Sequence, residues 1–371
     1  MDDFFYAEPV AQQVPLPPTL AGTGAFADLA TLEPQPGIVG YELNTPFWSD
    51  GALKQRWFSV PATNQFIGFG RDEPWQFPTG MVWIKHFEME LTNGVRESRR
   101  RLETRFLVRN DQGVHGFTYR WTTPPTNAVL VAEEGEEEMI EVRGAEGVRT
   151  QVWHYPSRQE CLQCHTAVAG WALGFNTRQL NRGRQIQALA EAGYFAEAPA
   201  EVHTLPAHAP LDDESAGVEW RVRSWLDSNC ASCHQPGGPA LGAWDARART
   251  PLSLTGLIDG LLNQDEGNPA ARLVVRGRVD LSMIHSRVAR TGDGRMPPVA
   301  SSVVDEQAVR LLDRWIQGRL AGWESYHEWR LARFGDASRP EGAPGADPDM
   351  DASVNALEYL AGGDPLLSGP G

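Results

Sequence analysis

The sequence lacks three features that would assign it to a class directly. No stretch approaches the roughly 18 uninterrupted apolar residues of a membrane span, and the N-terminus has neither the basic nor the apolar region of a signal peptide. Basic residues are outnumbered, 33 Lys and Arg against 48 Asp and Glu, which gives a net charge of −15. This charge disfavours polyphosphate and anionic membrane surfaces, so we expect no nucleic-acid partner and no membrane span. The chain is therefore expected to be cytoplasmic, or exported with its leader removed.

Cysteine is also scarce, but its placement is informative. The four cysteines form two copies of one pattern, Cys161-Leu-Gln-Cys164-His165 and Cys230-Ala-Ser-Cys233-His234. Two thiols at this spacing can each add to a vinyl group of one porphyrin, and the adjacent histidine can bind its iron. A zinc ribbon would place its cysteine pairs about 15–20 residues apart, whereas 65 residues separate these pairs. The sequence predicts two covalently bound haem c groups, with His165 and His234 as iron ligands.

A chain of 371 residues is long for one hydrophobic core, so several domains are expected. Residues 1–40, rich in Pro and Gly, are predicted to be an extended arm packed on another part of the chain. Short alternating segments at 41–155 predict an antiparallel β-sandwich. The predicted strands are Gln55–Val60, Met81–Glu90, Arg101–Val108, Gly116–Trp121, Ala128–Ala132, Met139–Val142 and Arg149–Tyr155. Helical spacing then predicts a first haem-binding segment at 156–216 and a helical domain at 217–320, before a tail at 321–371.

A low-spin haem needs a sixth ligand, commonly Met or His. The run Gly294-Arg295-Met296-Pro297-Pro298 places a methionine on a loop whose prolines prevent helix formation. We expect Met296 to bind the second haem iron, with ordinary core packing as the alternative. Helices are predicted on either side, one with Val222, Trp225 and Leu226 on the face of Cys230, and one whose N-cap signature is Ser302 with Asp305.

These residues resemble two known groups of proteins. Residues 217–320 resemble class I cytochrome c domains at Cys230 to His234, at Gln235-Pro236-Gly237-Gly238 and at Gly294 to Pro298. This resemblance implies two crossing helices, a Met-Pro loop as the source of the sixth ligand, and a backbone carbonyl at Pro236 that accepts the N–H of His234. Residues 20–320 also look like secreted bacterial di-haem c-type proteins with a β-rich N-terminal part. The runs that carry this wider resemblance are Tyr41 to Gly51, Phe77-Pro78, Lys85-His86-Phe87, Glu103-Thr104-Arg105 and Gln179-Leu180-Asn181.

The sixth ligand of the first haem stays open at this point. His86 shares a strand face with Val82 and Ile84, which would suit an apolar haem crevice, although a buried core histidine is the ordinary reading. His154, His203 and His208 are the alternatives, together with an open site that would allow peroxide or oxygen chemistry. Haem propionates also need partners, and the plausible donors are Arg178, Gln179, Asn181 and Arg295.

The C-terminal tail contains a second kind of site. Oxygen donors occupy positions 1, 3, 5, 7, 9 and 12 of the loop from Asp347 to Glu358, the pattern of an EF-hand calcium loop. The predicted calcium ligands are Asp347, Asp349, Asp351, Ser353 and Glu358. The tail resembles the short calcium-binding tails of many secreted bacterial proteins. Ala352 departs from the pattern, because a glycine normally occupies the sharp turn.

Together these features predict an α+β multidomain protein, with an N-terminal antiparallel β-sandwich followed by mainly α cytochrome c-type haem domains. The resemblance implies a periplasmic or extracellular di-haem cytochrome that transfers electrons. The acidic surface suggests a redox partner with a basic docking patch. The alternative is a peroxidase- or oxidase-type haem enzyme with an open site at the first haem and the second haem as its electron-transfer centre.

Overall fold

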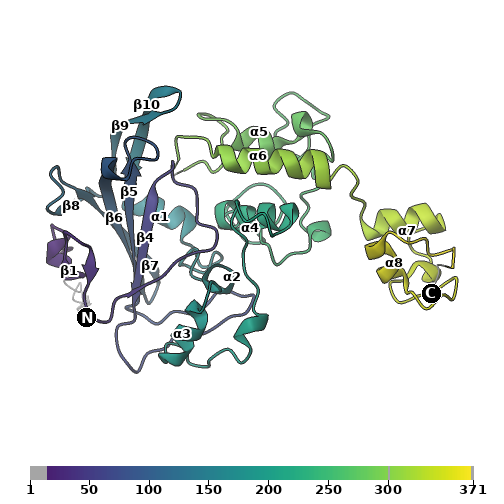
Figure 1. Cartoon of the computed structure of the whole chain (residues 1–371), viewed down its shortest axis with the longest axis horizontal. Helices are drawn as coiled ribbons and strands as arrows, with labels where there is room; N and C mark the ends of the chain where they lie inside the picture. Colours follow the sequence, from purple (N-terminus) through teal and green to yellow (C-terminus); the bar gives the residue numbers. More distant parts are fainter. Residues whose placement is uncertain (1–14, 300, 369–371) are drawn as a thin grey trace, which may run out of the picture. The chain divides into compact units, whose positions relative to one another are not determined.

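The computed structural model describes residues 15–299 and 301–368, in which helix and strand are nearly balanced at 24% and 22% (Figure 1). The chain forms two compact units. The first contains residues 1–250 and 287–311, and the second contains residues 251–286 and 312–371. Every helix in the described ranges is too short or too polar to traverse a lipid bilayer.

The first unit is built on a six-stranded antiparallel sheet whose strands lie side by side in chain order. These strands are β3 (Val39–Gly40), β4 (Leu53–Ser59), β5 (Val82–Glu90), β6 (Arg99–Asn110), β7 (Gly113–Trp121) and β8 (Ala128–Leu130). Two hairpins lie outside this sheet, formed by β1 (Phe26–Asp28) with β2 (Glu33–Pro34) and by β9 (Glu136–Gly144) with β10 (Gly147–Tyr155). Each of the seven predicted strands overlaps one of β4 to β10.

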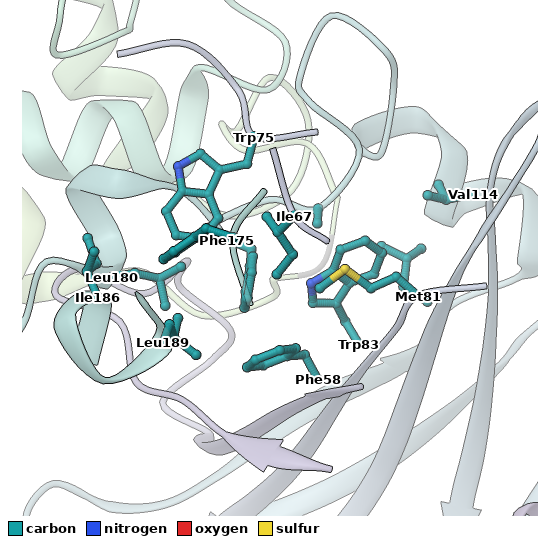
Figure 2. Close-up of a cluster of buried hydrophobic side chains, with 13 residues drawn as sticks. Phe58, Ile67, Trp75, Met81, Trp83, Val114, Phe175, Leu180, Ile186 and Leu189 are labelled. Carbon is teal, nitrogen blue, oxygen red and sulfur yellow. The ribbon is translucent and has the colours of Figure 1, made fainter. Parts of the chain in front are cut away.

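The two faces of the sheet are covered by different segments. On one face Trp57 and Ile84 pack against Leu20, Phe26 and Leu32 of the N-terminal arm. On the other face a cluster of aromatic and aliphatic side chains joins the strands to the helical segment that follows β10. Figure 2 shows side chains of this second cluster, with Phe58 and Trp83 of the sheet near Phe175.

The helices of the first unit are short. They are α1 (Arg158–Cys164), α2 (Thr177–Leu180), α3 (Gln185–Glu191) and α4 (Val218–Cys230). Helices α5 (Met283–Val288) and α6 (Glu306–Arg314) cross from one unit to the other, and α6 continues as a π-helical turn, Trp315–Arg319. The second unit adds α7 (Tyr326–Phe334) and α8 (Asn355–Ala361). Single 3₁₀ turns occur at Ala21–Thr23, Arg96–Ser98, Val202–Thr204, Leu252–Leu254, Val279–Leu281 and Pro340–Gly342.

The predicted fold class is wrong in both of its parts. The β region is one sheet with separate hairpins, covered by an arm and by helical segments, so it is not a sandwich of two large sheets. The region 217–320 is not mainly α, because between α4 and α5 the structure contains only 3₁₀ turns and irregular backbone. The described residues therefore contain no cytochrome-like helical domain. Periodicity located the flanking helices but not the long irregular segment between them.

Candidate functional sites

The first CxxCH motif lies on α1, directly after β10. The helix begins with a capping box, in which the Ser157 side chain accepts from the Glu160 N–H at 3.1 Å and the Glu160 carboxylate accepts from the Ser157 N–H at 2.7 Å. Helix α1 contacts β7 at Gly116. A Cβ at Gly116 would lie 2.7 Å from the sulfur of Cys161, so the helix docks here only because this strand position lacks a side chain.

His165 is oriented by the backbone that follows it. Its Nδ1 lies 2.6 Å from the carbonyl oxygen of Trp171, so an Nδ1–H group donates to that oxygen and leaves Nε2 for a metal. Burial, helped by Lys85 and Arg105, lowers the pKa of His165 to about 4 against the opposing effect of the Trp171 hydrogen bond. The imidazole is therefore neutral near pH 7, which is the form that binds a metal.

The second motif follows α4, which buries Val222, Trp225 and Leu226 as its periodicity predicted. His234 stacks on Trp244, with ring centroids 4.6 Å apart. Its buried Nδ1 has no hydrogen-bond partner, so the structure does not show the expected bond to the Pro236 carbonyl. Burial, helped by Arg287, lowers the pKa of His234 to about 4.

The two motifs meet at their second cysteines. The thiol of Cys164 is in hydrogen-bonding contact with the sulfur of Cys233, and all four cysteines are free of disulfides. This contact raises the pKa of Cys164 and lowers that of Cys233 to about 6. Burial raises the pKa of Cys161, and that of Cys230 to about 12. The two motifs are thus far apart in sequence but adjacent in space.

A cavity of about 540 Å³ lies beside both motifs. Cys161, Cys164 and His165 line it, and so do Ser232 and Gln235 of the second motif region. Its volume lies within the range of cofactor pockets. The cavity, the glycine beneath Cys161 and the fixed imidazole of His165 are compatible with a covalently attached porphyrin.

The cavity wall is rich in cations despite the acidity of the chain. Seven basic residues line it against four acidic ones: Arg56, Arg71, Lys85, Arg105, Arg178, Arg247 and Arg249 against Asp72, Glu73, Glu160 and Asp227. Sequence reasoning missed Arg56, Lys85 and Arg105 as site residues. The signal that could have found them is a charged residue at an inward-facing strand position, two residues from the apolar Phe58, Trp83 and Leu107.

The structure does not bring His86 to the first motif. Lys85 lines the cavity, so the next residue along β5 projects from the opposite face. There His86 is fully buried, its Nδ1 lies 2.8 Å from the Thr104 hydroxyl, and its ring packs edge-on against Trp121. The expectation of a haem ligand at His86 is corrected, because alternation along a strand puts residues 85 and 86 on different faces.

The other candidate histidines occupy three different environments. His154 lines the cavity, but its Nε2 lies 2.9 Å from the carboxylate of Glu160. His208 is buried outside the cavity lining, 3.6 Å from Asp227, and His203 is exposed. Of these three, only His154 is close to the first motif.

Met296 lies in the segment that the sequence predicted, but next to a different cavity. It lines a space of about 20 Å³ with Trp48 and Trp225, and His234 is not among the lining residues. Arg287 interacts with both residues. Its carbonyl accepts a hydrogen bond from the Met296 N–H at 3.0 Å, and its positive charge helps to lower the pKa of His234. Ligation by Met296 stays a prediction.

All four propionate donors proposed from sequence already have partners within the protein. The side-chain amide of Gln179 donates to the Thr45 carbonyl and to the Ser228 hydroxyl, and that of Asn181 donates to the Leu205 carbonyl. Arg178 pairs with Asp72 at 2.8 Å and lines the cavity. Arg295 donates to the Ser301 hydroxyl. Gln179 lines the cavity but its amide is bonded to other parts of the chain, and Asn181 lies outside the cavity lining.

The calcium-loop residues converge in the second unit. Asp347, Asp349 and Asp351 form the only group of three or more potential metal-ligating side chains found among the described residues. Glu358 is 5% exposed, and its buried Oε2 has no hydrogen-bond partner. Burial and the surrounding carboxylates raise the pKa of Glu358, which shows that these acidic groups lie close together.

The remaining loop features follow the same pattern. Ala352 has φ +73°, the left-handed conformation for which a glycine is usual at this turn. The Ser353 N–H donates to Asp351 at 2.7 Å. The loop geometry is therefore formed without the glycine, at the cost of some backbone strain.

Comparison of the chain with protein-family models, with curated proteins and with solved structures found no match.

Proposed function

We propose that the protein is an exported di-haem c-type cytochrome that passes electrons between two porphyrins bound at the CxxCH motifs. Cys161 and Cys164 would hold the first haem with His165 as its iron ligand, and Cys230 and Cys233 would hold the second with His234. Haem supplies one-electron chemistry when it is bound. The protein binds it, orients the imidazoles and excludes water.

The contact between Cys164 and Cys233 carries this proposal. Each sulfur would bond to the edge of a different porphyrin, so a contact between them places the two haem edges next to each other. Adjacent haems favour direct electron exchange and require no proton-transfer residue. The acidic surface favours a redox partner with a basic docking patch.

Haem attachment is tested on chain matured in a bacterial periplasm. A pyridine haemochrome assay is expected to give two haems per chain, and the intact mass is expected to exceed that of the polypeptide by two haems. A redox titration should then resolve two one-electron steps. A colourless chain with the bare polypeptide mass would refute the proposal.

A second candidate function is a haem enzyme with an exchangeable sixth site at the first haem. The 540 Å³ cavity favours it, because among the described residues that line it there is no methionine and the only histidines are His154 and His165. The Nε2 atom of His154 is already engaged by Glu160. Carbon monoxide added to the reduced protein distinguishes the candidates: a shifted spectrum at one haem supports the enzyme, and unchanged spectra at both support the carrier.

We also propose that the second unit binds calcium through Asp347, Asp349, Asp351, the Ser353 carbonyl and Glu358. The cluster of three aspartates, and the buried, unpartnered oxygen of Glu358 whose pKa these aspartates help to raise, support this assignment among the described residues. Calorimetric titration of the full chain with calcium is expected to show one site, which Glu358→Gln should weaken at least tenfold. The matched control is Glu341→Gln, an exposed glutamate of the same unit. Equal affinity in both variants would remove Glu358 from the site.

A further inference from the structure

A row of three cations crosses the sheet beneath the large cavity. Arg56 on β4 is directly opposite Lys85 on β5, and Lys85 is directly opposite Arg105 on β6. Directly opposite residues of antiparallel strands project from the same face. All three line the cavity that Cys161 and His165 also line. The cation row is thus part of the cavity wall.

Two of the three cations have no anionic partner. Within the described residues the Arg56 guanidinium makes no hydrogen bond or ion pair, and its Nη2 atom is buried. Among the described residues the Nζ atom of Lys85 forms no hydrogen bond or ion pair and lies 4.8 Å from the centre of the Phe87 ring. Burial and the neighbouring cations lower the pKa of Lys85 well below its usual value, so a nearby anion is needed to keep it charged. Arg105 alone is paired, with Nη2 2.5 Å from the buried carboxylate of Glu103. Like charges directly opposite each other destabilise a sheet, so the row needs anions from elsewhere.

The cation row also extends across the sheet in the direction away from Cys161. Cys161 lies over Gly116 on β7, and β6, β5 and β4 follow in order. At about 4.8 Å between neighbouring strands, the three steps from β7 to β4 cover about 14 Å. A porphyrin carries its two propionates on the half opposite its vinyl groups. Its anionic groups are thus remote from the sulfurs, as Arg56 and Lys85 are.

We propose that Arg56, Lys85 and Arg105 bind the two carboxylates of the porphyrin attached at Cys161 and Cys164. This assignment rests on the proposed haem attachment. The assignment gives a role to basic side chains that lack an anionic partner beneath an apolar cluster, in a chain whose net charge is −15. The carboxylates would balance the charge of the row, and the row would fix the far edge of the cofactor against the sheet.

The test uses the holoprotein and measures its two reduction potentials. Cations near a haem favour the reduced iron, which carries one positive charge fewer. Arg56→Gln and Lys85→Gln should therefore each lower one of the two reduction potentials. At a fixed solution potential, the ratio of oxidised to reduced haem at that site should rise about tenfold. Arg56→Lys retains the positive charge, so its two reduction potentials should equal those of the native protein. Arg99→Gln is the control, because Arg99 forms an exposed pair with Glu90 at the end of β6.

The outcomes separate this assignment from the proposed function. If both haems are attached and Arg56→Gln and Lys85→Gln leave both potentials unchanged, the carboxylate assignment is overturned. A chain without haem overturns the proposed function instead. Inorganic phosphate added to the holoprotein should leave both spectra unchanged. A saturable phosphate-induced shift that Lys85→Gln abolishes would assign the row to a free oxyanion. Arg105→Gln is not used, because it would leave Glu103 buried without a partner.

Discussion

The two CxxCH motifs share a pattern but not an environment. The first rests on a sheet, with a glycine beneath Cys161 and a carbonyl that fixes His165. The second begins at the last residue of α4, and His234 stacks on Trp244 with no hydrogen bond to its Nδ1 among the described residues. The first imidazole is therefore held by a directional bond and the second mainly by packing. Under the proposed function, the two motifs would attach their cofactors alike, whereas their surroundings would hold the two histidines with different rigidity.

Removing one pair of thiols has the largest expected effect. Cys161→Ala with Cys164→Ala should abolish attachment of the first haem and leave the second, because each motif supplies its own thioethers. The pyridine haemochrome signal should fall by half. The reciprocal pair, Cys230→Ala with Cys233→Ala, is the control and should also retain one haem. Loss of both haems from the first variant would show that the two sites mature as one.

Filling the space beneath α1 should affect only the first site. In Gly116→Ala the new Cβ would meet the Cys161 sulfur at 2.7 Å. Overpacking of this kind costs about 1–3 kcal/mol, so the first haem should be attached in lower yield while the second is unaffected. Gly345→Ala, where an added Cβ meets no atom within 4 Å, is the matched control. Unchanged haem content in Gly116→Ala, measured by intact mass, would contradict the tight docking of α1.

Removing the Met296 thioether should change only the second site. Met296→Ala is expected to abolish a sulfur-to-iron charge-transfer band and to lower the potential of the second haem, because methionine ligation raises it. Near-infrared absorption and a redox titration report both effects. Met139→Ala, an exposed methionine on β9, should change neither. Persistence of the band in Met296→Ala would exclude this sulfur as the ligand.

The smallest effect expected is a difference in thiol reactivity before haem is attached. The pKa of Cys233 is lowered to about 6 by the Cys164 thiol, whereas burial raises the pKa of Cys161. At pH 7 iodoacetamide should therefore modify Cys233 first, because the thiolate is the nucleophile. Its rate should fall as the pH decreases from 7 to 5, since Cys233 becomes protonated. Peptide mapping that finds Cys161 modified first at pH 7 would contradict this order.

Local patterns in the sequence located the strands but not how they are assembled. Alternation predicted the seven segments that overlap β4 to β10, since one-sided burial leaves a direct signature in the sequence. The sandwich was wrong because periodicity does not reveal what covers each face. Here the covering elements are the arm around Leu20 and Phe26 on one side and the segment around Phe175 on the other. The helical domain at 217–320 was wrong because the segment between α4 and α5 has no periodic signal.

The candidate sites also consist of features that local sequence patterns predict and features that depend on tertiary contacts. The attachment cysteines and the calcium loop are local patterns and could be named by residue. The meeting of Cys164 with Cys233, the Trp171 carbonyl at His165 and the cation row depend on contacts between distant segments, which one sequence does not specify. His86 illustrates the limit. The sequence identified a histidine with apolar neighbours in a strand. It did not show which face of that strand lies toward the motif, and this became evident only because Lys85 lines the cavity.

The glycine in β7 has a consequence for how the sheet must be assembled. Moving this strand by one position relative to its neighbours would replace Gly116 with His115 or Phe117 below the first residue of the motif, and would exchange inward-facing for outward-facing side chains. The pairing of Leu107 with Gly116 is therefore required both for a correctly aligned sheet and for docking of α1. An error in strand alignment would therefore also displace the motif that α1 carries.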